Sequence, residues 1–231
     1  MQSHCCECND GSVQFEEELE RVLPLELPYR ERLIAKAAQH LHLILAANEA
    51  MNLTRITGPQ DAAIKHVYDS VAPWKHFVLA RRVLDAGTGA GFPGLPLSIV
   101  LPGTQFTLAE SIQKKARFVD SAVEALELHN VKVVAERAEQ RALAQLPEII
   151  IARAVAPMHK LVELFKKPLR QGSTLMLYKG PEVDQEIEES RSANLDAEIV
   201  CRYELPNGLG TRTLVQIRAQ ARTARTALSA S

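Results

Sequence analysis

The residues of this chain best suited to chemistry form a loop at 85–94, where an apolar run ends in a carboxylate and glycines follow at every second position. Such glycines let the backbone pass close to a nucleotide-like cofactor at the end of a strand. Gly87, Gly89 and Gly91 stand first, third and fifth, whereas a dinucleotide-binding loop has its third glycine at the sixth position. The sixth residue here is Phe92, whose ring would obstruct the close approach of helix and strand. The spacing therefore favours S-adenosylmethionine over a dinucleotide.

The loop could bind the amino-acid end of S-adenosylmethionine, which carries an α-ammonium, a carboxylate and a sulfonium. Asp85 could accept a hydrogen bond from the ammonium or could orient the loop. The N–H groups of Gly87 and Gly89 could donate to the carboxylate. A plain connection between a strand and a helix is the alternative, and three alternating glycines after an acid argue against it.

The ends of the later apolar runs carry further candidates. Glu110 lies about 20 residues beyond the loop, where an acid binds a ribose diol in nucleotide-binding units, and it could also stabilise the start of the next helix. Glu139 belongs to the polar run after the third strand, which could meet the amine of adenine or begin a solvated helix. Arg153 directly follows a buried run, so we expect it at the mouth of the site, paired with the cofactor carboxylate or with a substrate phosphate.

Basic residues near these positions are compatible with an anionic partner. Lys114 and Lys115 begin a helix, where cations oppose the helix dipole, so contact with RNA phosphates is one interpretation and a solvated helix face is the other. Lys179 follows a strand and could face the cleft. Eight acids and two bases lie in residues 1–31, so the rest of the chain is basic although the net charge is only −1.

The elements that must position these residues follow from apolar periodicity. Residues 29–51 carry apolar residues at helical spacing and predict a helix, and a second helix is predicted over 59–67. From residue 82 onward strands alternate with helices, which predicts a mostly parallel sheet with helices on both faces. The predicted strands cover 82–85, 105–110, 131–135, 148–152, 173–178, 197–203 and 211–218. The predicted helices between them cover 92–101, 112–128, 157–169 and 182–192.

The last two predicted strands are separated only by residues 205–210, which leaves no room for a helix and predicts an antiparallel pair. Seven strands with an antiparallel finish form the layout of S-adenosylmethionine-dependent methyltransferases, whereas a dinucleotide-binding fold would be all parallel. We therefore predict an α/β fold of this kind in four parts. These are an acidic, flexible segment at 1–27, a helical extension at 28–80, a methyltransferase core at 81–218 and a disordered basic tail at 219–231.

The N-terminal segment contains Cys5, Cys6 and Cys8, but the second ligand pair that a zinc site needs is missing, so no metal is expected. No run approaches the roughly 18 apolar residues of a membrane helix, and the N-terminus lacks the apolar core of a signal peptide. These features predict a cytoplasmic protein without a membrane partner.

Several motifs occur here in the order seen in one family. They are Asn52-Leu-Thr54, His66-Val-Tyr-Asp-Ser70, Asp85-Ala-Gly-Thr-Gly-Ala-Gly-Phe-Pro-Gly-Leu-Pro96, Glu110-Ser111 with Lys114-Lys115, Arg137-Ala-Glu139 and Ala152-Arg-Ala154. Through them the chain resembles the RsmG family, also called glucose-inhibited division protein B, over residues 28–218. The resemblance implies a class I methyltransferase fold with an N-terminal helical extension and S-adenosylmethionine as methyl donor. It implies N7 of a guanine in 16S ribosomal RNA, in the small subunit or its precursor, as acceptor.

The resemblance also implies which residues contact the cofactor, namely Gly87, Phe92, Ala138, Glu139 and Arg153. Glu110 joins them on the ribose argument given above. The family commonly has valine where Ala86 stands and serine where Ala152 stands, and neither change removes a group that the chemistry needs.

Guanine N7 carries an in-plane lone pair, so it can attack the sulfonium methyl directly without loss of a proton. In-line transfer driven by positioning, with no general base, is therefore the mechanism expected of this enzyme, which we expect to be a monomer. Arg153, His66 and Lys179 are candidates for holding the base or neighbouring phosphates, and His66 could equally be a packed helix residue. The chain has no Asn/Asp-Pro-Pro-aromatic motif for exocyclic amines and no Pro-Cys nucleophile. A nicotinamide-dependent oxidoreductase and a non-catalytic, cofactor-binding RNA or scaffold module are the alternatives.

Overall fold

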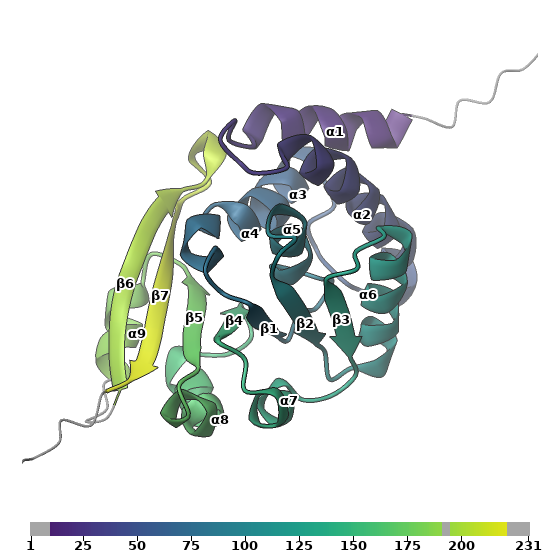
Figure 1. Cartoon of the computed structure of the whole chain (residues 1–231). Coiled ribbons are helices and arrows are strands. Elements are labelled where there is room, and N and C mark those ends of the chain that lie inside the picture. Colours follow the sequence, from purple (N-terminus) through teal and green to yellow (C-terminus); the bar gives the residue numbers. More distant parts are fainter. Residues whose placement is uncertain (1–9, 191–194, 221–231) are drawn as a thin grey trace, which may run out of the picture.

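A seven-stranded sheet runs through the computed structural model, which describes residues 10–190 and 195–220 (Figure 1). Its strands are β1 (Arg82–Ala86), β2 (Gln105–Ala109), β3 (Val131–Val134), β4 (Ile149–Arg153), β5 (Thr174–Lys179), β6 (Leu195–Glu204) and β7 (Thr211–Ala219). The longer helices are α1 (Asp10–Val22), α2 (Arg30–Met51), α5 (Gly94–Val100), α6 (Gln113–Ala125), α7 (Ala138–Gln145), α8 (Met158–Arg170) and α9 (Val183–Glu189). The short helical turns are α3 (Pro59–Ala62), η1 (Ala63–Tyr68), α4 (Asp69–Val71), η2 (Trp74–Phe77) and η3 (Pro206–Gly208). Across the described ranges, no helix has the length and apolar content needed to span a bilayer.

The strands lie in the order β3-β2-β1-β4-β5-β7-β6. β7 runs antiparallel to both of its neighbours, whereas the other pairs are parallel. The predicted α/β sheet with an antiparallel finish is therefore confirmed. Because parallel strands end at one edge of a sheet, the loops that follow β1, β2, β4 and β5 lie together there, and this edge is where ligands bind in such folds.

Apolar residues form two cores, one on each face of the sheet. Val83 belongs to the core that includes residues of α2, α5 and α6, and the next residue, Leu84, belongs to the core that includes residues of α7 and α8. This alternation follows from the two-residue period of a strand. Helices cover both faces (Figure 1), so the strand ends and the loops that follow them are held in fixed positions.

The helical extension predicted over residues 28–80 packs on the first of these cores. α2 begins one residue after the predicted start and buries Leu33, Ala37, Leu41 and Ile44 along one face, as their spacing predicts. The segment predicted as one helix over 59–67 is instead the short α3 followed by the π-helix η1 and by α4. A π-helix holds an extra residue per turn, which an apolar pattern of 3.6 residues does not reveal.

The prediction of a flexible segment over 1–27 differs from the structure, because residues 10–22 form α1. Phe15 and Leu19 lie four residues apart on its inner face and are fully buried in the first core. Acidic residues, among them Glu16, Glu17 and Glu20, occupy its outer face. The cysteine cluster lies outside the described residues, and so does the predicted tail beyond residue 220.

Candidate cofactor and substrate site

The loop between β1 and α5 crosses the carboxyl edge of the sheet, as its glycines predict. Gly87, Gly89 and Gly91 have φ angles of 71°, 61° and 104°, a region that L side chains rarely adopt. Gly94 begins α5, and a Cβ there would lie 2.3 Å from the side chain of Leu108. The loop therefore requires glycine for its backbone conformation and for its close packing on β2.

Asp85 lies fully buried beneath this loop. Its Oδ2 accepts hydrogen bonds from the Thr88 hydroxyl at 2.7 Å and from the Gly94 N–H at 2.9 Å. Its Oδ1 has no partner among the described residues. Burial raises the pKa of Asp85 to about 6, against the opposing effect of these hydrogen bonds. Of the two predicted roles, the geometry corresponds to orienting the loop, while contact with a cofactor stays a prediction.

Glu110, at the end of β2, connects that strand to the loop. Its Oε2 accepts from the Gly89 N–H at 3.1 Å, and its Oε1 accepts from the Ile112 N–H at 2.8 Å. The second bond lies in the turn that begins α6, as the capping interpretation expects. The N–H group of Gly89 is therefore already paired with Glu110 and is not free to donate to a cofactor carboxylate.

A small cavity of about 130 Å³ lies beside the loop, where β1, β2 and β3 end. It is lined by Ala86, Gly87, Ala109, Ser111, Glu136, Arg137, Ala138, Glu139, Val155, Leu161, Leu164 and Phe165. The structure thus brings together three of the predicted cofactor residues, Gly87, Ala138 and Glu139. Their partly apolar surroundings suit a flat heterocycle with a polar edge.

A larger cleft of about 710 Å³ opens on the other side of the loop, toward β4 and β5. It is lined by Leu53, Thr54, Ile56, Lys65, His66, Asp69, Gly87, Thr88, Gly89, Ala90, Phe92, Arg153, Ala154, Tyr178, Lys179, Gly180, Glu186 and Arg212. All three candidates for holding substrate, Arg153, His66 and Lys179, lie in this lining. Gly87 lines both the cavity and the cleft, so the two meet at a residue without a side chain.

Phe92 forms part of the cleft wall and contacts two of the substrate candidates. The His66 ring stacks on it with centroids 4.6 Å apart and planes at 7°, and the Arg153 guanidinium lies 5.6 Å from the Phe92 centroid. His66 Nε2 lies 2.9 Å from the Thr54 hydroxyl. Burial, followed by the nearby Arg153 charge, lowers the pKa of His66 to about 3. His66 is thus both a packed residue and a neutral part of the cleft wall.

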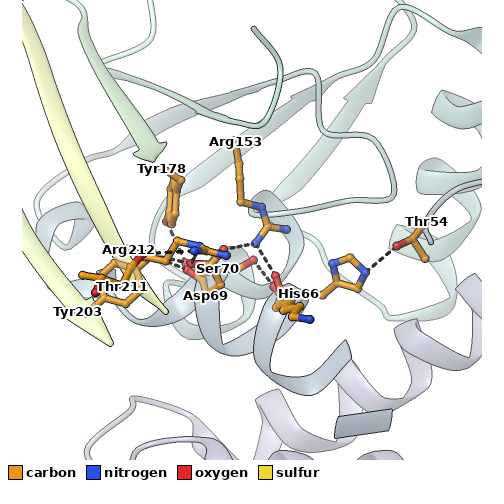
Figure 2. A network of polar contacts seen from close by, with 10 residues as sticks. Thr54, His66, Asp69, Ser70, Arg153, Tyr178, Tyr203, Thr211 and Arg212 are labelled. Carbon is orange, nitrogen blue, oxygen red and sulfur yellow. Dashed lines mark hydrogen bonds and ion pairs between the residues drawn. The ribbon is translucent and has the colours of Figure 1, made fainter. Parts of the chain in front are cut away.

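Arg153 is held by the helical extension (Figure 2). Its Nη1 donates to the carbonyl of Lys65 and to Asp69 Oδ2, both at 3.1 Å. Asp69 is buried and also accepts from the Tyr203 hydroxyl at 2.8 Å, and its Oδ1 lies 3.8 Å from Arg212 Nε. The arginine predicted to face a cofactor carboxylate or a phosphate therefore already has a protein carboxylate as partner.

Sequence reasoning gave no individual role to Asp69, Tyr203 or Arg212. Tyr203 and Arg212 lie in β6 and β7, more than a hundred residues after Asp69, and no spacing connects positions so far apart. The one usable signal was an acid within a helical run whose neighbours Ile64, Val67 and Val71 are apolar and buried. An acid on a buried face needs a partner, which for Asp69 is Arg153.

The predicted basic residues fall into two groups. Lys179 lies in the cleft wall, where its Nζ forms an ion pair with Glu186 Oε2 at 2.7 Å. Lys114 and Lys115 line neither the cavity nor the cleft. Lys114 Nζ donates to the carbonyl of Ala50 at 2.6 Å, near the end of α2, and the half-buried Lys115 stands beside it in the first turn of α6.

Comparisons with known sequences agree with one another. A family model described as GidB, rRNA small subunit methyltransferase G, matches residues 33–207. A protein named ribosomal RNA small subunit methyltransferase G from Solibacter usitatus is 52% identical over 210 residues, which cover 89% of this chain and 100% of that protein. One of the same name from Carboxydothermus hydrogenoformans is 37% identical over 186 residues, covering 77% of this chain and 79% of its own length.

Solved structures share the fold at low identity. An O-methyltransferase from Bacillus cereus in complex with SAH has a TM-score of 0.54 at 16% identity, covering 79% of this chain and 91% of that one. The cofactor-bound Rv0187 from MTB has a TM-score of 0.52 at 17% identity, covering 78% and 89%. The fold is that of class I methyltransferases, with the helical extension added at its N-terminus.

Proposed function

The chain belongs to the rRNA small subunit methyltransferase G family, and from this premise we propose that it transfers a methyl group from S-adenosylmethionine to N7 of a guanine in 16S ribosomal RNA. Methylation of small-subunit ribosomal RNA, with S-adenosylmethionine as the donor, follows from the family itself. The finer parts of the proposal are guanine N7 as the acceptor, transfer without a general base, and action as a cytoplasmic monomer.

The donor supplies a methyl group activated by a sulfonium, and the residues present fit it. Gly87 has no side chain where the small cavity meets the cleft, and a Cβ there would lie 3.1 Å from Val155 Cγ2. A ligand with a nucleoside at one end and an amino acid at the other can therefore extend from the cavity into the cleft. We assign Ala138 and Glu139 to its adenine, Glu110 to its ribose, and Phe92 with Arg153 to its amino-acid half.

Guanine N7 is favoured as the acceptor because the polar groups in the cleft wall are ion-paired or have a lowered pKa. Asp69 is paired with Arg153, Lys179 is paired with Glu186, and the pKa of His66 is lowered to about 3. None of these groups is free to remove a proton near pH 7. Guanine N7 loses no proton when it accepts a methyl group, so this cleft suits that acceptor better than an amine or a ring carbon.

The acceptor then has to be held rather than activated. Both hydrogen bonds that Arg153 donates to the described residues use Nη1, which leaves Nη2 and Nε for the carboxylate of the donor and for guanine O6 or a phosphate of the acceptor. Asp69 and the Phe92 ring fix the guanidinium in place. In-line transfer from a fixed donor to a fixed base requires only such positioning from the protein.

The proposal is tested with labelled S-adenosylmethionine and small ribosomal subunits from a strain that lacks the modification. We expect label in 16S ribosomal RNA, released by reductive cleavage specific for 7-methylguanine. Label that resists this cleavage, or label in another RNA, would contradict the acceptor assignment while leaving the methyltransferase intact.

Two glycine variants test the donor site with a matched control. Gly87→Val should reduce transfer by about a hundredfold, because its side chain would fill the junction between cavity and cleft. Gly172→Val, in the loop before β5 at the opposite edge, replaces a glycine that also has a positive φ of 102° and whose Cβ would have no neighbour within 4 Å, so it should leave transfer unchanged. Equal effects of the two variants would show that Gly87 has no special role.

A further inference from the structure

His40 on α2 is a buried imidazole outside every motif considered above. It is 2% exposed and does not line the cleft. Its Nε2 lies 2.8 Å from the carbonyl oxygen of Ala90, in the middle of the glycine loop. A carbonyl only accepts, so His40 Nε2–H is the donor. Burial lowers the pKa of His40 to about 4, and the ring is therefore neutral near pH 7 and carries its one proton on Nε2.

His40 contacts three consecutive residues of the loop. Besides its bond to Ala90, its Cε1 would lie 3.0 Å from a Cβ on Gly91, so it packs directly against that backbone. Its ring lies 4.9 Å from that of Phe92, at 36°. The ring of His66, from η1, also stacks on Phe92. The helical extension therefore contacts the Phe92 ring through two imidazoles, each from a different helix.

These contacts lie next to the residues that meet the donor. The cleft is lined by Gly87, Gly89, Ala90 and Phe92. His40, which does not line the cleft, contacts Ala90 and Phe92. Ala90 is buried, so loss of the imidazole would take away the hydrogen-bond donor of a largely desolvated carbonyl oxygen. Without that bond, the loop must rearrange to find another donor, which would move Phe92 and the neighbouring glycines.

We propose that His40 is a positioning residue for donor binding, through which the helical extension fixes the conformation of the glycine loop. The inference rests on the donor half of the proposed function and is independent of the acceptor. A merely structural His40 would affect the stability of the fold, whereas a positioning residue affects donor affinity in a protein that remains folded.

The test compares three variants of the full chain by calorimetric binding of S-adenosylhomocysteine and by steady-state kinetics. His40→Phe keeps an aromatic ring and removes the donor, so we expect product affinity to fall and the KM for S-adenosylmethionine to rise by about three- to tenfold. The KM for the RNA substrate should not change. His40→Gln presents an amide N–H at the place of Nε2 and should restore affinity to within about twofold of the wild type.

The control is His42→Phe on the same helix. His42 instead packs on Phe15 of α1, with ring centroids 4.9 Å apart. Should His40→Phe fail to fold, His40→Asn replaces it, because an asparagine amide is too short to reach Ala90. Wild-type affinity in His40→Phe, equal weakening by His42→Phe, or no rescue by His40→Gln would overturn the inference. A wild-type protein that binds no S-adenosylhomocysteine would instead contradict the donor assignment itself.

Discussion

The carboxyl of Asp85 is buried where ionisation is unfavourable, and this gives the protein a predictable dependence on pH. Its pKa in the folded state is about 6, above the ordinary value of 3.8. The group therefore contributes stability that is fully present below pH 3.8 and is lost as the pH rises through 6. The gap between the two pKa values corresponds to about 3 kcal/mol.

Asp85→Asn should remove this dependence and keep the loop, because an amide oxygen can accept from Thr88 and Gly94 as the carboxylate does. Denaturant unfolding of both proteins between pH 4 and pH 7 measures it. We expect Asp85→Asn to gain up to about 3 kcal/mol relative to the wild type as the pH rises through this range. His40 and His66 also titrate, but they are common to both proteins and cancel in the difference. A constant difference across the range would contradict this account of Asp85.

Burial, rather than distance, decides how much the ion pairs of the extension contribute. Asp69 and Arg153 lie 3.1 Å apart and their side chains are 5% and 15% exposed, whereas those of the 2.8 Å pair of Asp61 and Lys65 are 45% and 30% exposed. Asp69→Asn leaves two arginines near each other without their counter-charge and should reduce the free energy of unfolding by about 3 kcal/mol. Asp61→Asn, the control on the same segment, should cost less than about 1 kcal/mol. Similar losses in urea denaturation would show that burial does not distinguish these pairs.

The helices and strands with strong apolar periodicity were predictable, and the weakly patterned ones were not. All seven strands were predicted from apolar or β-branched runs, and α2 from apolar residues at helical spacing. α7 was predicted only as one of two interpretations of the run around Glu139, because it is eight residues long and buries only Ala142. The extra residue of η1 leaves no periodic signal. Elements whose apolar face is short or irregular are thus fixed by tertiary packing and not by local pattern.

The residues of the candidate site were also predictable only in part. The glycine loop and the residues at strand ends were predictable, because the chain order of a parallel sheet brings strand ends to one edge. The partners of those residues were not. His40 lies 50 residues from Ala90, and Asp69 lies 84 residues from Arg153, and neither separation carries a spacing rule. Both partners come from the helical extension, so the extension completes a site whose centre belongs to the core.

α1 packs on the first core through its apolar face. Substitutions on this face test how much α1 contributes to the free energy of unfolding. Phe15 and Leu19 are 1% and 0% exposed, and Glu16 beside them is exposed. Phe15→Ala should cost about 3–5 kcal/mol and Leu19→Ala about 2–5 kcal/mol of unfolding free energy, from lost burial and the cavity left behind. Glu16→Ala should stay within about 0.5 kcal/mol. Urea unfolding measures all three, and small losses for the apolar pair would mean that α1 detaches without consequence for the core.

Charge is distributed unevenly over the molecule. The exposed face of α1 is acidic, whereas four basic side chains and two acidic ones line the cleft at the carboxyl edge of the sheet, so an RNA should approach from that edge. Lys115 belongs to the first turn of α6, directly after β2, and therefore stands at this edge. Lys167 belongs to the last turn of α8 and stands at the opposite edge, because a helix that follows a parallel strand runs back along the sheet.

Lys115→Ala should weaken binding of small-subunit RNA and reduce the slope of log affinity against log salt by about 0.7–0.9, the contribution of one phosphate contact. Lys167→Ala removes the same charge and should leave the slope unchanged. Neither lysine forms an ion pair in the part of the chain that the structure describes, so each variant removes one unpaired positive charge. Filter binding of the RNA at several salt concentrations measures both slopes. Equal changes would mean that the RNA responds to net charge alone, and a larger change for Lys167→Ala would place the RNA on the opposite side of the sheet from the cleft.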